Sequence, residues 1–172
     1  MGQAAKYLLK NLLTCWLLAL STSSALAVEI GAPAPDFTLR TFSGQQFSHS
    51  PQTGRPLLLV FWNTWCVNCQ RELGELDRLD KLYGAQGLVI LAVNTGINDS
   101  EEKARNYLQQ RGHSFAAGFD RDFSLGTAYG VRGVPTICLI DAAGVVRYQQ
   151  AGLPDDLAKR LGLSLAFMPE RE

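Results

Sequence analysis

Residues 56–72 read PLLLVFWNTWCVNCQRE, an apolar run followed by two closely spaced cysteines. The run over residues 56–62 is continuous, which predicts a strand buried on both faces of a sheet. A helix should begin near Cys66 and reach about Leu82. One face of that helix is apolar on a helical wheel, and it consists of Cys69, Leu73, Leu76, Leu79 and Tyr83.

The rest of the chain alternates strand and helix patterns. A β-hairpin is predicted around Ser43 and Gly44. Further strands are predicted over residues 88–93, 115–119, 136–140 and 145–149, and helices over 100–110, 123–129 and from Pro154 onward. This order predicts an α/β domain with an N-terminal hairpin and a mixed central sheet that helices cover on both faces.

The first 27 residues differ from the others. Lys6 and Lys10 precede a short apolar run over residues 12–20, and the segment ends in Ala25-Leu26-Ala27. This pattern predicts a signal peptide over residues 1–27 and one domain over residues 28–172, exported to the periplasm. An uncleaved inner-membrane anchor is the alternative. The formal net charge is zero, so no basic field indicates nucleic acid as a partner.

Three kinds of chemistry are open to Cys66 and Cys69: redox exchange, metal binding and a structural disulfide. A metal site needs more ligands, and the remaining candidates, Cys138, His49 and His113, are isolated in sequence. A structural disulfide would close so short a loop that it stabilises little. A cysteine at a helix N-terminus, in contrast, has a lowered pKa, and the second thiol lies one turn further on. The pattern therefore favours disulfide exchange, with neither metal nor cofactor.

Glu72 and Asp80 both fall on the apolar side of the predicted helix. Glu72 lies one turn after Cys69, where a partly desolvated carboxylate suits proton transfer; the alternative is a side chain that reaches solvent. Asp80 is near the helix end, too far from the cysteines to take part. In the second half of the chain, Pro135 should begin a strand. Sequence chemistry alone predicts a trans bond before it.

Three segments together carry a family resemblance: residues 31–39 (GAPAPDFTL), residues 60–69 (VFWNTWCVNC), and residues 130–135 (GVRGVP) with 139–144 (LIDAAG). They resemble the exported thiol-disulfide oxidoreductases of the TlpA/ResA type, which have a thioredoxin-like fold. The similarity covers the whole domain after residue 27. Residues 94–129 match the central β-α insertion that separates this family from plain thioredoxin.

The resemblance implies a role for each matched residue. Cys66 is then the nucleophile and Cys69 the resolving thiol of a redox-active disulfide, and Glu72 matches the family's acidic residue. Trp65 matches the tryptophan beside the active site, and Trp62 matches a more buried one. The bond between Val134 and Pro135 is implied to be cis, packed against the disulfide, with the Val134 backbone pairing with substrate.

Three positions depart from the family pattern. Asn68 replaces the usual proline before the second cysteine, which changes the donors near the sulfurs and leaves the redox potential open. Gly74 replaces another proline. Val60 stands where cytosolic thioredoxin has a buried aspartate, so Glu72 is the only matched proton-transfer carboxylate. We interpret Cys138, on the strand after Pro135, as a buried core thiol.

These observations predict an exported disulfide reductase. The resemblance implies a membrane electron donor of the DsbD or CcdA type, and exported disulfide proteins, including apocytochrome c, as substrates. A thiol oxidase or isomerase with the same cysteines is one alternative. A copper-binding chaperone that uses Cys66, Cys69 and His113 is another. A peroxidase is disfavoured, because the P-x-x-x-[ST]-x-x-C pattern is absent at both cysteines.

Overall fold

The computed structural model of the chain describes residues 28–50 and 54–164. The predicted signal peptide, residues 1–27, lies outside the described residues. Within them, no helix combines the length and the apolar character that crossing a membrane requires.

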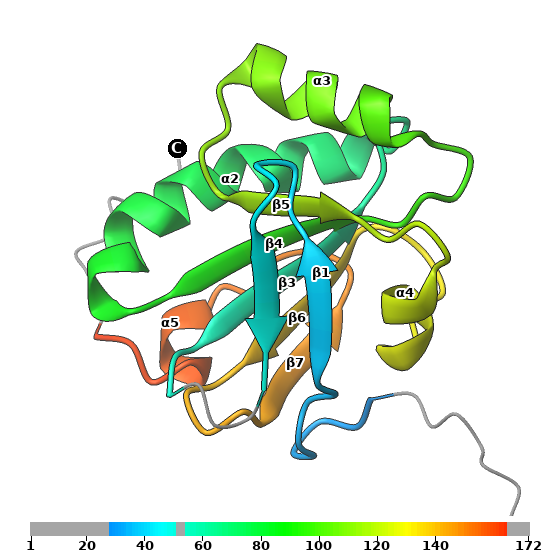
Figure 1. Ribbon diagram of the computed structural model, residues 1–172. Coiled ribbons are helices and arrows are strands. Elements are labelled where there is room, and N and C mark those ends of the chain that lie inside the picture. The colour runs from blue at the N-terminus through cyan, green and yellow to red at the C-terminus, as the bar shows by residue number, and fades with distance from the viewer. Residues whose placement is uncertain (1–27, 51–53, 165–172) are drawn as a thin grey trace, which may run out of the picture.

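A mixed five-stranded sheet forms the centre of the fold, in the order β5-β4-β3-β6-β7 (Figure 1). Its strands are β3 (Leu57–Trp62), β4 (Val89–Asn94), β5 (Ala116–Phe119), β6 (Thr136–Ile140) and β7 (Val146–Gln150). β3 pairs in parallel with β4 and antiparallel with β6. Every residue of β3 is buried, as its continuous apolar run predicts.

The predicted hairpin forms a separate two-stranded sheet, β1 (Phe37–Arg40) and β2 (Gln46–His49). It lies against the edge strand β5, where the Phe42 amide donates to the Ala117 carbonyl. Gly118 permits this approach, because a Cβ there would stand 2.7 Å from the Leu39 side chain and 2.9 Å from the Arg40 carbonyl. At the opposite edge, residues 31–34 pair with the start of β7 through a bridge between Pro33 and Val145.

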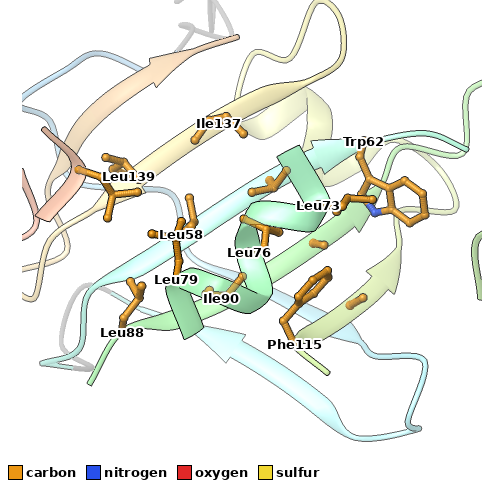
Figure 2. Close-up of a cluster of buried hydrophobic side chains, with 14 of the residues drawn as sticks. Leu58, Trp62, Leu73, Leu76, Leu79, Leu88, Ile90, Phe115, Ile137 and Leu139 are labelled. Atoms are coloured by element: carbon orange, nitrogen blue, oxygen red, sulfur yellow. The ribbon is translucent and has the colours of Figure 1, made fainter. Parts of the chain in front are cut away.

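Helices lie on both faces of the sheet, as predicted. They are α2 (Val67–Tyr83), α3 (Glu101–Arg111), α4 (Ser124–Ala128) and α5 (Leu157–Arg160), with a 3-10 turn at Gly84–Gln86. α2, α3 and α5 share one core with alternate residues of β3, Leu58, Val60 and Trp62. Figure 2 shows Leu58 and Trp62 together with Leu73, Leu76 and Leu79 of α2. α4 and the hairpin share the other core with Leu57, Leu59 and Phe61. The alternation of side chains along a strand thus divides the interior into two layers.

The helix boundaries follow the capping chemistry of the sequence. Cys66 is the N-cap of α2, and Ser100 caps α3 by accepting the Lys103 amide at 3.2 Å. The last helix begins at Leu157, three residues later than predicted. The Pro154 carbonyl accepts the Leu157 amide at 3.3 Å, so Pro154 belongs to a turn before the helix.

Candidate active site

Cys66 and Cys69 form a disulfide at the N-terminus of α2. Cys66 retains 7% of its surface exposed, whereas Cys69 is fully buried. The two cysteines therefore differ in exposure, and Cys69 is the more buried, as the sequence predicted. Cys69 belongs to the same buried core as Trp62 and Leu73, so its surroundings are apolar side chains.

The backbone at the start of α2 is arranged around the Cys66 sulfur. The Cys69 amide donates to this sulfur at 3.1 Å, and the Cys66 amide donates to the Asn63 carbonyl at 3.2 Å. Amides in the first helical turn have no partner within the helix, so they stabilise negative charge at the N-cap. In the reduced protein this arrangement favours the thiolate of Cys66.

Trp65, which precedes Cys66, is 52% exposed, and its indole N–H donates to the Ile97 carbonyl at 3.0 Å. Trp62 is fully buried and stacks at an angle against Tyr107 of α3. The two tryptophans thus lie where the family resemblance implies, one at the surface and one beneath it.

The bond between Val134 and Pro135 is cis. The family resemblance implies this isomer, whereas sequence chemistry alone predicted trans. Val134 packs against both cores, including the one that contains the two cysteines. A hollow of about 430 Å³ lies beside the bond, lined by the 130–136 loop and the end of β7.

Glu72 is half-buried on α2, one turn after Cys69. Its carboxylate accepts the Leu153 amide at 3.3 Å, which joins the helix to the loop before α5. The negative charge of Glu72 also acts on Tyr148. Burial raises the pKa of Tyr148, the charge of Arg160 opposes this, and the charge of Glu72 adds to it.

Asn68, the residue that departs from the family pattern, is exposed. Its side-chain carbonyl accepts a hydrogen bond from Arg71 at 2.7 Å. At the position where the family resemblance implies a proline, this chain therefore presents a polar side chain that is hydrogen-bonded to the cation of Arg71, one turn along the helix.

The structure does not bring His113 to the cysteine pair. The Nδ1 atom of His113 lies 2.6 Å from the carboxylate of Asp77. Asp77 is eight residues beyond Cys69 on α2, which corresponds to about 12 Å along the helix axis. Within the described parts of the chain, no group of three or more His, Cys, Asp or Glu side chains could hold a metal ion. The geometry gives the copper-chaperone alternative no support.

Sequence reasoning missed a polar network next to the cysteines. Asp99 accepts the Thr64 amide at 2.6 Å and the Thr64 hydroxyl at 2.8 Å. It also accepts the side-chain amide of Asn94 at 2.8 Å, and Asn94 in turn accepts from Asn63 at 3.2 Å. The sequence did contain a signal for this network. Asn63 and Asn94 each follow a predicted strand directly, and the carboxyl ends of neighbouring parallel strands meet at one sheet edge.

Comparisons with known proteins agree with this geometry. Residues 30–149 match the model of the AhpC/TSA family. The chain belongs to this family. The thiol-disulfide oxidoreductase ResA of Geobacillus thermodenitrificans (strain NG80-2) is 36% identical over 121 residues, which cover 70% of this chain and 68% of the relative.

The thiol:disulfide interchange protein DsbE of Escherichia coli (strain K12) is 38% identical over 127 residues, which cover 72% of this chain and 65% of DsbE. A crystal structure of a thiol:disulfide interchange protein of the thioredoxin family from Chlorobium tepidum TLS has a TM-score of 0.65 and 26% identity. The match covers 78% of this chain and 99% of that one. The family resemblance and the thioredoxin-like fold are therefore confirmed. The chain is a thiol-disulfide oxidoreductase.

Cys138 of β6 is buried on the opposite side of the sheet from the disulfide, in the core shared by α4 and the hairpin. Burial raises the pKa of Cys138 from 9.0 to about 12. The thiolate is the reactive form, so at pH 8 this thiol should react very little.

We predict that iodoacetamide at pH 8 leaves Cys138 unmodified in the folded, oxidised protein and alkylates it after denaturation, as measured by peptide mass spectrometry. Reactivity should increase only as the pH approaches the raised pKa. Rapid alkylation of the folded protein at pH 8 would contradict a buried, protonated thiol.

Proposed function

We propose that the chain is an exported disulfide reductase that acts through Cys66 and Cys69 in the periplasm. One observation carries the proposal: the two cysteines differ in exposure, since Cys66 at the N-cap of α2 is 7% exposed and Cys69, one turn further on, is fully buried. Two-step exchange needs this asymmetry. One sulfur must reach the substrate disulfide, and the other must stay unreacted until the mixed disulfide has formed.

In the proposed reaction the Cys66 thiolate attacks one sulfur of a substrate disulfide and releases the other substrate sulfur as a thiolate. Cys69 then loses its proton and attacks the Cys66 sulfur, which releases the second substrate sulfur. The substrate gains two electrons and leaves as two thiolates, which take up protons from the surrounding water. The enzyme gives up the proton of Cys69 and is left with the disulfide between Cys66 and Cys69.

Other residues take the roles that the resemblance implies. Trp65, Val134 and Pro135 bind the substrate polypeptide. Glu72 accepts the proton of Cys69, because Cys69 is fully buried whereas the carboxylate one turn away is only partly buried. The support for Glu72 is this placement on the helix face that carries Cys69.

Export would use residues 1–27, as a cleaved signal peptide or as an inner-membrane anchor. A reductase in an oxidising compartment must be reduced again after each turnover. We propose a membrane electron donor of the DsbD or CcdA type, and exported disulfide proteins, including apocytochrome c, as substrates. The names of the relatives ResA and DsbE support thiol-disulfide exchange.

The direction of electron flow separates a reductase from an oxidase or isomerase. We predict that the potential of the Cys66–Cys69 couple lies on the reducing side, closer to that of thioredoxin (about −270 mV) than to that of the oxidant DsbA (about −120 mV). Equilibration with glutathione or dithiothreitol buffers measures it. A value near about −120 mV would indicate a thiol oxidase instead.

Cys69→Ser should accumulate mixed disulfides, because the first attack proceeds and the second cannot. The expected result is a set of adducts that are visible on non-reducing gels and can be identified by mass spectrometry. Cys66→Ser is the matched control and should form none through this route. Failure of the Cys69→Ser protein to trap any partner would count against the exchange mechanism.

Glu72→Gln should slow resolution of the mixed disulfide about a hundredfold at neutral pH and change the pH dependence of that step. Single-turnover reduction, followed from low to high pH, measures it. Glu75→Gln is the control, since Glu75 lies on the same helix in an ion pair with Arg78. An unchanged pH profile for Glu72→Gln would leave Glu72 a surface residue.

A further inference from the structure

Away from the cysteines, a hollow of about 600 Å³ lies between the hairpin turn, α3 and the end of β5. Three arginines line it, Arg40, Arg105 and Arg121, and among the described residues Glu101 is the only carboxylate in its lining. Neither cysteine of the disulfide nor any residue of the 130–136 loop belongs to that lining. The hollow is therefore separate from the exchange site, and its excess of positive charge needs a physical explanation.

The three arginines come from separate elements that the fold brings together. Arg40 is the last residue of β1, Arg105 lies in the second turn of α3, and Arg121 follows β5 by two residues. β1 approaches β5 so closely that a Cβ on Gly118 would stand 2.9 Å from the Arg40 carbonyl. The Arg105 guanidinium donates to the Phe42 carbonyl and lies 5.1 Å from the centroid of the Phe42 ring. Tertiary contacts, rather than neighbouring positions in sequence, thus gather the positive charge.

Glu101 holds two of the three guanidinium groups in place. One of its carboxylate oxygens accepts from Arg105 at 3.0 Å, and the other accepts from Arg121. A guanidinium has several N–H donors in one plane, and the bond to Glu101 uses only one nitrogen of Arg121. The Arg121 side chain is 78% exposed, so its other N–H groups are accessible to a ligand. Because one carboxylate serves two cations, the pair of arginines keeps a net positive charge.

Arg40 carries a further positive charge that nothing in the described chain neutralises. Its side chain is exposed and forms no ion pair or hydrogen bond with any residue that the structure describes. The hollow therefore has two uncompensated positive charges, one on Arg40 and one on the two arginines that share Glu101. Like charges in one hollow repel each other, and a ligand with two negative charges would replace this repulsion by attraction.

We infer that this hollow is a binding site for a small organic dianion of the phosphate-ester kind. Guanidinium groups suit phosphate, because their planar N–H donors match its oxygens in pairs. A volume of about 600 Å³ lies within the range of small-molecule sites, so there is room for an organic group beside the rings of Phe42 and Phe119. The inference goes beyond the proposed function and does not depend on it, since the hollow and the exchange site share no residue.

Isothermal titration calorimetry on the purified protein tests the site, with phenyl phosphate and inorganic phosphate as probes. At pH 8 both probes carry close to two negative charges, and sodium chloride keeps the ionic strength constant. Phenyl phosphate should bind at one saturable site, about threefold or more tightly than inorganic phosphate, because its ring removes apolar surface from water. The absence of saturable binding for both probes would overturn the inference. Equal affinities would contradict an organic ligand.

Arg40→Ala should weaken the binding of phenyl phosphate about tenfold, or about 1.4 kcal/mol. Because the Arg40 side chain is exposed and has no partner in the described chain, this variant removes the charge without loosening the fold. Arg132→Ala is the matched control, since Arg132 is also exposed and without a partner among the described residues but does not line the hollow. It should change the affinity less than about twofold. Equal losses in the two variants would reflect overall charge and overturn the inference.

NMR spectroscopy locates the bound probe. Titration with phenyl phosphate should shift the backbone amide signals of residues 40–44 and of Glu101, Arg105 and Arg121, all of which line the hollow. The signals of residues 63–69, at the start of α2, should stay unchanged. Shifts confined to residues 63–69 would place the anion at the N-terminus of α2 instead and overturn the inference.

Discussion

The central position of β3 is the constraint on which the active site depends. β3 lies between β4 and β6, so the turn that follows Trp62 has a neighbour on each side. The parallel register places Asn94 beside Trp62, and the antiparallel register places Thr136, the residue after Pro135, beside Phe61. Strand pairing therefore brings the end of β4 and the start of β6 beside the end of β3, just before the turn that leads to Cys66. The burial of six consecutive apolar residues in β3 stabilises that arrangement.

Sequence reasoning predicted the elements well where one physical signal dominates. The uniform apolar run predicted a strand buried on both faces, and the helical spacing from Cys69 to Tyr83 predicted the buried face of α2, as found. The same wheel predicted that Glu72 would be partly desolvated, and it is half-buried. The start of the last helix was misplaced, because a proline is equally suited to a turn and to a first helical position.

Other features could not be read from local patterns. The cis isomer before Pro135 came only from the family resemblance, since the local preference favours trans. The hydrogen bonds of Asp99 could not be predicted from local sequence, because they join it to Thr64, which lies thirty-five residues earlier in the chain. Polar residues in a loop are common, and only the paired strand ends reveal that Asn63 and Asn94 share a hydrogen bond. Tertiary pairing, rather than composition, carries that information.

The coverage of the sheet edges limits where another polypeptide can pair with the central sheet. The hairpin covers β5 through the Phe42 amide, and residues 31–34 cover the start of β7. An uncovered edge strand offers a row of free amides and carbonyls to any extended polypeptide, which invites aggregation. In the part of the chain that the structure describes, both edges of the central sheet are covered in part. The sheet therefore offers a substrate polypeptide fewer free backbone groups for strand pairing than an open sheet would.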